Sequence, residues 1–181
     1  MDRAAFEKLA LEHLDAVYRL ALQLLRHPDE AADLVQETYL KALRAAGRFE
    51  ERGGGIRPWL FKILHNAFYS RVGRGPGPQT TEDLDRISDG APAPGEAGPA
   101  WDLATMDWEQ VDERLKRAIE RLRPEYRTAL LLWAVEGLKY REIAEIQDIP
   151  IGTVMSRLHR ARSILAGQLA DLAEETGRRN G

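Results

Sequence analysis

Residues 139–167 read KYREIAEIQDIPIGTVMSRLHRARSILAG and predict two helices separated by a tight break. The break falls at residues 148–150 (Asp-Ile-Pro), because a residue that precedes proline is pushed away from the α-helical region. The second helix then runs without a breaker to Gly167. At about 100° per residue, one narrow arc of this helix is apolar, which predicts a buried stripe. Its members are Val154, Leu158, Ala161 and Leu165.

The opposite face of that helix is small, polar and basic. It carries Gly152, Met155, Ser156, His159, Arg160 and Ser163, flanked by Arg157 and Arg162. A short helix, a turn and a basic helix form the helix-turn-helix layout, whose second helix enters the major groove of DNA. The alternative is an ordinary antiparallel helix pair with a solvated basic face. Helix 151–167 contains three arginines and no acid, whereas bundle surfaces usually mix their charges, so the pattern favours DNA binding.

Composition excludes several classes of protein. The 181 residues include no cysteine, so the chain has no disulfide framework and no thiolate metal site. No stretch approaches the roughly 20 apolar residues of a membrane span, and the beginning of the sequence lacks a signal-peptide pattern. We therefore expect a cytoplasmic protein.

Charge is segregated along the chain. The net charge is only −3, but residues 75–113 contain ten acids and one base, and the sequences on both sides are net basic. Such asymmetry points to nucleic acid as a partner of the two ends.

The beginning of the chain predicts two amphipathic helices, over residues 4–26 and from Pro28 to about Ala46. The second helix has a charged face with Asp33, Gln36, Glu37, Lys41 and Arg44, among which Leu34 and Leu40 are set. Two leucines on a charged face indicate a docking surface for another protein. A third helix of the same domain covering them is an equal alternative on periodicity alone.

A further helix, opened by Pro58, follows a run of glycines at residues 53–55. Its predicted core stripe comprises Ile56, Trp59, Leu60, Ile63 and Ala67. Four aromatic side chains (Phe61, His65, Phe68 and Tyr69) are predicted to point away from that stripe, beside Lys62 and Asn66. Exposed rings among cations are typical of single-stranded nucleic acid binding, where rings stack on bases and cations contact phosphates. Burial of Phe61 and Phe68 in the core is the alternative.

Residues 73–99 hold six glycines and five prolines and predict a flexible linker. Helical patterning resumes by Trp108, Pro124 opens another helix, and Gly137 is placed to end it. The expected fold is all-α: two small helical domains joined by an acidic linker, the second with a C-terminal helix-turn-helix. No catalytic or metal-ligand motif is found, so we expect no enzyme, no metal and no cofactor.

Three stretches in this order resemble the extracytoplasmic-function (ECF) sigma factors of bacterial RNA polymerase. They are DEAADLVQETYLKAL (29–43), RPWLFKILHNAFYSR (57–71) and LRPEYRTALLLWAVEGLKYREIAEIQDIPIGTVMSRLHRAR (122–162). The resemblance implies a dissociable initiation subunit, monomeric when free, that binds core polymerase and recognises and helps melt promoter DNA. It implies a first domain at 1–74, a linker at 75–107 and a second domain at 108–181.

The resemblance also implies three groups of contact residues. Asp33, Leu34, Gln36, Glu37 and Leu40 would dock on the clamp helices of the largest polymerase subunit. Arg57, Trp59, Lys62, His65, Asn66, Tyr69 and Arg71 would bind the minus-ten element, with Asn66 lining a pocket for a flipped-out base. Thr153, Met155, Ser156, Arg157, His159, Arg160 and Arg162 would bind the minus-thirty-five element.

Two departures from the family pattern are visible. Met155 stands where many relatives carry arginine, so a polar base contact is replaced by an apolar one. Lys139 stands where a serine or threonine often caps the first helix of the motif, which predicts a weaker cap. The stretch 149–162 is similar to that of sigma factors governed by zinc-containing anti-sigma proteins, so an anti-sigma factor is an expected partner.

Two other functions fit parts of the sequence. One is a helix-turn-helix transcription factor that binds duplex DNA alone, which leaves the first domain unexplained. The other is a pure protein-interaction module, in which the outward arginines would be dispensable.

Overall fold

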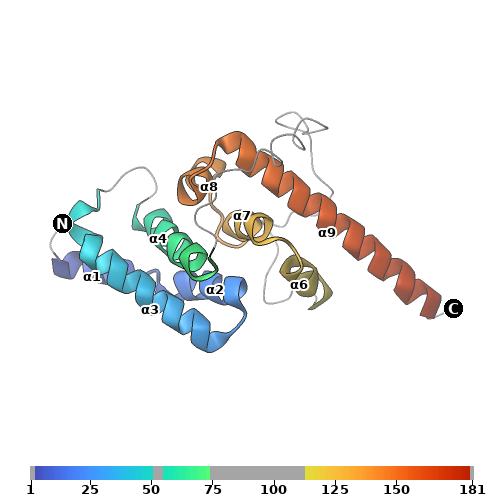
Figure 1. The fold of residues 1–181 in the computed structure, drawn as a ribbon, viewed down its shortest axis with the longest axis horizontal. Helices are drawn as coiled ribbons and strands as arrows, with labels where there is room; N and C mark the ends of the chain where they lie inside the picture. The colour runs from blue at the N-terminus through green and yellow to red at the C-terminus, as the bar shows by residue number, and fades with distance from the viewer. Residues whose placement is uncertain (1–2, 51–54, 74–112, 180–181) are drawn as a thin grey trace.

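The computed structural model describes residues 3–50, 55–73 and 113–179, which form two helical units (Figure 1). The first comprises α1 (Arg3–Leu11), α2 (Leu14–Leu25), α3 (Pro28–Ala45), a 3-10 turn (Ala46–Arg48) and α4 (Ile56–Arg71). The second comprises α6 (Glu113–Glu120), α7 (Pro124–Ala134), α8 (Tyr140–Gln147) and α9 (Ile151–Arg179). The described residues contain no strand, so the all-α prediction is confirmed. The predicted linker (75–107) lies outside them, and the domain boundaries stay a prediction.

The first unit differs from expectation near its start. The predicted single helix over residues 4–26 is wrong, because the chain turns at Glu12 and His13 between α1 and α2. This turn lays α1 against α4, where the ring of Phe6 meets those of Phe49 and Trp59 edge to face, with centroids 5.7 and 5.8 Å away. Neither proline nor glycine marks the turn, so the residue pattern gives no warning of it.

The second unit has the expected helix-turn-helix. Asp148 adopts a left-handed conformation (φ 54°) at the end of α8, and the amide of Ile149 donates to the carbonyl of Ala144 at 3.0 Å. This closes α8 before Pro150 and confirms the predicted break. Gly137 also has a positive φ (65°). This left-handed conformation commonly ends a helix, and glycine adopts it without strain. Helix α9 does not stop near Gly167 but continues to 29 residues, and its far end projects beyond α6 (Figure 1).

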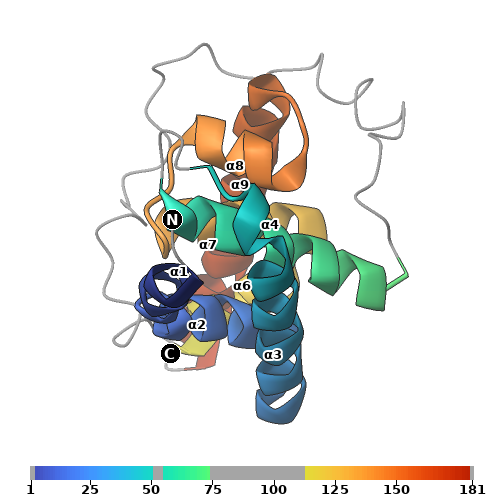
Figure 2. The same ribbon diagram turned by 90° about the vertical axis from the view of Figure 1, so that its left-hand side faces the viewer.

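The two units pack directly on each other. Helix α4 lies between the other helices of the first unit and the α7–α8 pair of the second, as the two perpendicular views in Figures 1 and 2 show. Helix α2 also contacts α7. As a result α4 is covered on two sides, and eight of its 16 residues are buried.

Candidate polymerase and promoter interfaces

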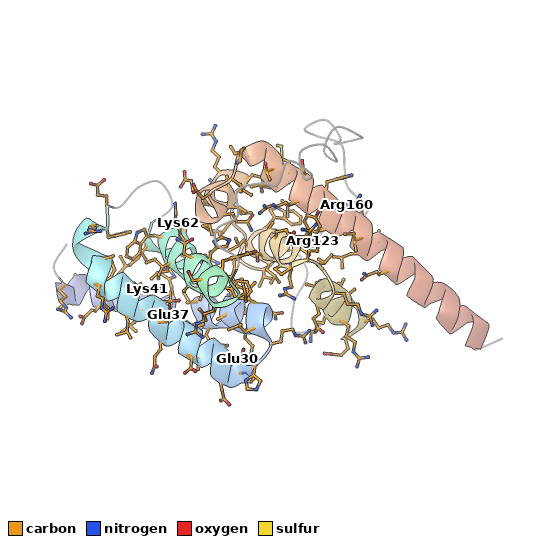
Figure 3. All side chains as sticks on the ribbon, in the orientation of Figure 1. Glu30, Glu37, Lys41, Lys62, Arg123 and Arg160 are labelled. Carbon is orange, nitrogen blue, oxygen red and sulfur yellow. The ribbon has the colours of Figure 1, made fainter. Side chains whose placement is uncertain are left out.

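The outer face of α3 presents a mixed polar surface. Asp33, Gln36 and Leu40 are exposed, and the Leu40 side chain stands 54% open to solvent. Glu37 accepts from Lys41 Nζ at 2.6 Å (Figure 3 labels both residues on α3) and from Arg71 Nε at 2.9 Å, and the second bond connects α3 to the end of α4. The hydrogen bond from Lys41, followed by that from Arg71, lowers the pKa of Glu37. Four of the five predicted docking residues therefore lie at or near one accessible face.

Leu34, the fifth, does not. The prediction that it stands exposed among charges is wrong, since it is fully buried. Helix α3 packs on both α2 and α4, so its buried arc is wider than a single stripe. Thr38 belongs to the same arc and donates its hydroxyl to the Leu34 carbonyl at 2.7 Å. Core packing explains Leu34, and it is withdrawn as a docking contact.

The aromatic face of α4 is also placed differently from expectation. Phe61 and Phe68 are buried, and His65 and Tyr69 are only 5% and 7% exposed. The Tyr69 hydroxyl lies 3.5 Å from Thr128 Oγ1 of α7, and its ring lies 4.5 Å from that of His65. The prediction of an exposed aromatic face is therefore wrong for this conformation. The rings are buried because the second unit covers that side of α4.

Burial changes the acid–base behaviour of His65. Loss of solvent lowers the pKa of its imidazole to about 4, and the cations Arg157 and Lys62 act in the same direction against a weak hydrogen bond with Asn66. His65 is thus neutral at physiological pH.

The remaining predicted minus-ten residues fall into two groups. Asn66 is exposed and Lys62, labelled in Figure 3, is half-buried, so both reach solvent. Trp59 is half-buried in the ring cluster with Phe6 and Phe49. The guanidinium of Arg71 donates to the carboxylate of Glu37. Arg57 Nη2 donates to Glu136 Oε2 of the second unit at 2.6 Å.

The basic face of α9 is arranged as predicted. Val154, Leu158, Ala161 and Leu165 are all buried, at 0–1% exposure. On the opposite side Met155, His159 and Arg160 are exposed, and Arg160 points away from the molecule (Figure 3). The Ser156 hydroxyl donates to the Gly152 carbonyl at 3.0 Å and stays half-exposed.

Thr153, which was also predicted to bind the minus-thirty-five element, does not lie on this exposed face. It is buried (7% exposed) because it precedes Val154 on the side of α9 that faces the core, so it is not accessible to DNA here.

The two flanking arginines are held by the protein. Arg157 Nη1 donates to Gln147 Oε1 of α8 at 3.1 Å. The guanidinium of Arg162 lies over the ring of Trp133 in α7, 4.2 Å from its centroid. Both remain half-exposed, so each can turn one edge of its guanidinium to a phosphate while it braces α9.

Sequence reasoning missed Glu136. Its carboxylate is fully buried and bonded to arginines of the first unit. An acid directly after the apolar run of α7 was the available signal, because a buried acid needs a charged partner.

The described residues contain no group of three or more histidines or acids placed to hold a metal ion. None of their helices is long and apolar enough to cross a membrane.

Comparison with known proteins places both units. The family model "Sigma-70 region 2" matches residues 9–75, and "Sigma-70, region 4" matches residues 112–165. The chain is 35% identical to the ECF RNA polymerase sigma factor SigE of Mycolicibacterium smegmatis over 97% of its own length and 66% of that protein. It is 32% identical to the RNA polymerase sigma-H factor of Pseudomonas aeruginosa, covering 96% of this chain and 91% of the other.

A solved structure is similar as well. It is the sigma factor RpoE of Bartonella quintana in complex with the anti-sigma factor NepR, with a TM-score of 0.66 and 30% identity. The match covers 92% of this chain and 97% of that one.

Proposed function

Because this chain belongs to the ECF sigma factors, promoter-recognising initiation subunits of bacterial RNA polymerase, we propose that its two units have separate binding roles. Residues 1–74 bind core polymerase and the minus-ten element, residues 108–181 bind the minus-thirty-five element, and residues 75–107 link them. The observation that carries this assignment is α9, whose basic face is exposed directly opposite a fully buried apolar stripe.

The second unit reads duplex DNA through α9. Ser156, His159 and Arg160 reach base edges in the major groove, since none of them is needed for the core. Met155 (38% exposed) meets a thymine methyl group. Arg157 and Arg162 bind phosphates and fix the position of the helix on the backbone.

The first unit acts on the minus-ten element through α4. Asn66, exposed at mid-helix, lines the pocket for a flipped-out base, and Lys62 contacts the phosphates. Arg57, His65 and Tyr69 join this surface only after the second unit has moved away from α4. Trp59 supports it from the ring cluster.

The outer face of α3 docks on the clamp helices of the largest polymerase subunit. Leu40 supplies the apolar contact there and Asp33, Gln36 and Glu37 the polar ones. A small apolar centre within a polar rim is the usual anatomy of such a surface.

The resting partner of the chain is an anti-sigma factor, an assignment supported by its likeness to RpoE bound to NepR. Sigma factors are regulatory proteins, and this chain acts without catalysis or cofactor of its own, in the cytoplasm and as a monomer when free.

Polymerase docking is tested by Leu40→Glu. We expect loss of co-purification with core polymerase and loss of run-off transcription, because a charge replaces the apolar centre of the interface. Helix content measured by circular dichroism should not change, since Leu40 is exposed. The matched control is Leu11→Glu on α1, where the leucine is 57% exposed. Equal loss in both variants, or in neither, would contradict docking through α3.

A further inference from the structure

The buried carboxylate of Glu136 connects the two units. Glu136 follows α7, and its side chain is 0% exposed. Arg19 of α2 donates to it through Nε at 3.1 Å and Nη2 at 3.2 Å. Arg57 of α4 donates through Nη2 to Oε2 at 2.6 Å and to the backbone carbonyl of the same residue at 2.8 Å. One acid of the second unit thus binds two helices of the first.

The charges around this contact are complementary. Arg26 pairs with Glu120 of α6, so arginines of the first unit meet acids of the second at two places. Arg127 of α7 reaches in the other direction and donates to the carbonyl of Leu24, at the end of α2, at 3.1 Å. The contact therefore has the directional bonds of a specific interface.

The buried acid decides how such an interface opens. With both arginines in place the carboxylate is compensated, whereas removal of one partner from a buried ion pair leaves an uncompensated charge. When the units separate, water solvates all three groups. Either the contact is complete or the units come apart, and this favours two states over a continuum.

The contact covers the face of α4 that the proposed function assigns to the minus-ten element. Arg57 is bonded to Glu136, Tyr69 lies against Thr128, and His65 is buried beside Tyr69. A melted strand cannot stack on these rings or pair with this guanidinium while the second unit occupies their place.

We propose that Glu136, with Arg19 and Arg57, forms a latch that holds the free chain closed and hides the minus-ten face of α4. The latch must open before that face meets DNA. The role of the covered face in minus-ten binding rests on the proposed function. The latch itself rests only on the contacts between the units.

The conformational test uses two spin labels. The native chain has no cysteine, so Ala32→Cys on α3 and Glu145→Cys on α8, both exposed, give one label in each unit of the full chain. Electron–electron distance measurements should give one narrow distribution without further change. Glu136→Gln and Arg19→Gln should each broaden it and shift it to longer distances. Glu113→Gln, which breaks an exposed pair with Lys116 inside α6, is the control and should not. Unchanged distributions in both latch variants would overturn the proposal.

Binding of a single-stranded minus-ten oligonucleotide to the free chain forms the second arm. Glu136→Gln and Arg19→Gln should both bind it at least threefold more tightly than the native chain. The two variants change the net charge in opposite directions, so a common gain cannot be a charge effect. Longer distances without tighter binding would support the latch and count against the minus-ten assignment of α4.

Discussion

Two arginines of α9 that are two positions apart have different surroundings. Arg160 is exposed on the face that holds Met155 and His159, whereas Arg162 lies 4.2 Å from the centre of the Trp133 ring. A guanidinium held over a ring contributes to folding as well as to phosphate binding. Arg160 is therefore the better residue for testing base readout alone.

We expect Arg160→Ala to cost roughly 1–3 kcal/mol in minus-thirty-five binding and to relax specificity at one or two positions. The measurement is run-off transcription with core polymerase from promoters varied through the minus-thirty-five element. Arg3→Ala on α1, which also removes one exposed arginine, is the control. A common reduction at every promoter variant would make Arg160 a phosphate contact instead.

His65 predicts a pH dependence of stability. Its pKa is about 4 in the closed protein against 6.5 in water, because burial disfavours the imidazolium. Above pH 6.5 the imidazole is neutral in both states, and its burial does not reduce the free energy of unfolding. As the pH falls from 6.5 towards 4, the unfolded chain binds a proton that the folded chain does not, so the free energy of unfolding decreases. By that linkage the free energy of unfolding should fall by about 2 kcal/mol between pH 7 and pH 5 through this residue.

Denaturant titrations at pH 7 and pH 5 measure this loss. In His65→Gln the difference between the two pH values should shrink by about the same amount. A variant that keeps the full pH dependence would exclude His65 as its source.

The residues that sequence reasoning misplaced share a cause. Leu34, His65 and Tyr69 were assigned from a single helical arc, and each lies on a helix that is covered from more than one direction. The alternative of core burial, kept open for the two leucines of α3, is correct for Leu34 and not for Leu40.

At the scale of the element, α9 could be predicted because only one of its sides is covered at its beginning. Its stripe and its exposed face follow directly from the period of 3.6 residues. In α4 the core stripe is only part of the buried surface, and periodicity cannot show a second covering layer. The break between α1 and α2 was hidden for another reason: no helix-breaking residue accompanies it.

The cap of α8 predicts a stabilising change. Lysine has no hydrogen-bond acceptor in its side chain, so only half of a capping box forms, with the Lys139 amide donating to Glu142 Oε2 at 2.8 Å. Lys139→Ser would add an acceptor for the first-turn amides. We expect an increase of about 0.5–1 kcal/mol in the free energy of unfolding.

Thermal denaturation followed by circular dichroism checks this change. Lys139→Ala, which removes the charge without supplying an acceptor, is the control. A serine variant no more stable than the alanine variant would show that the cap is already satisfied.

At the scale of the whole molecule, the contact between the units could not be read from the sequence. Glu136, Arg19 and Arg57 are up to 117 positions apart, and a charged residue on a helix is more often solvated than paired at such a distance. The order of the units was predictable because each carries its own local pattern.

The closed arrangement predicts poor DNA binding by the free chain. The α4 face is covered, and the α9 face alone offers few phosphate contacts, so promoter duplex should bind weakly, with strong salt dependence and little sequence preference. Core polymerase aligns both units on one promoter and should restore specificity. Gel-shift titrations with and without polymerase measure the difference. Nanomolar specific binding by the chain alone would favour a stand-alone transcription factor.

The length of α9 has a mechanical consequence. At 29 residues it extends about 43 Å at 1.5 Å per residue, with the residues proposed to read bases in its first three turns and its far end clear of α6 (Figure 1). When its first turns bind DNA as proposed, the helix would act as a lever with its pivot at the DNA. A tilt of about 10° at the groove moves the distal end by roughly 7 Å over that span. A contact made at the distal end of α9 would exert a torque on the residues proposed to face DNA. Small changes in the angle at which α9 docks would produce large displacements of its distal end.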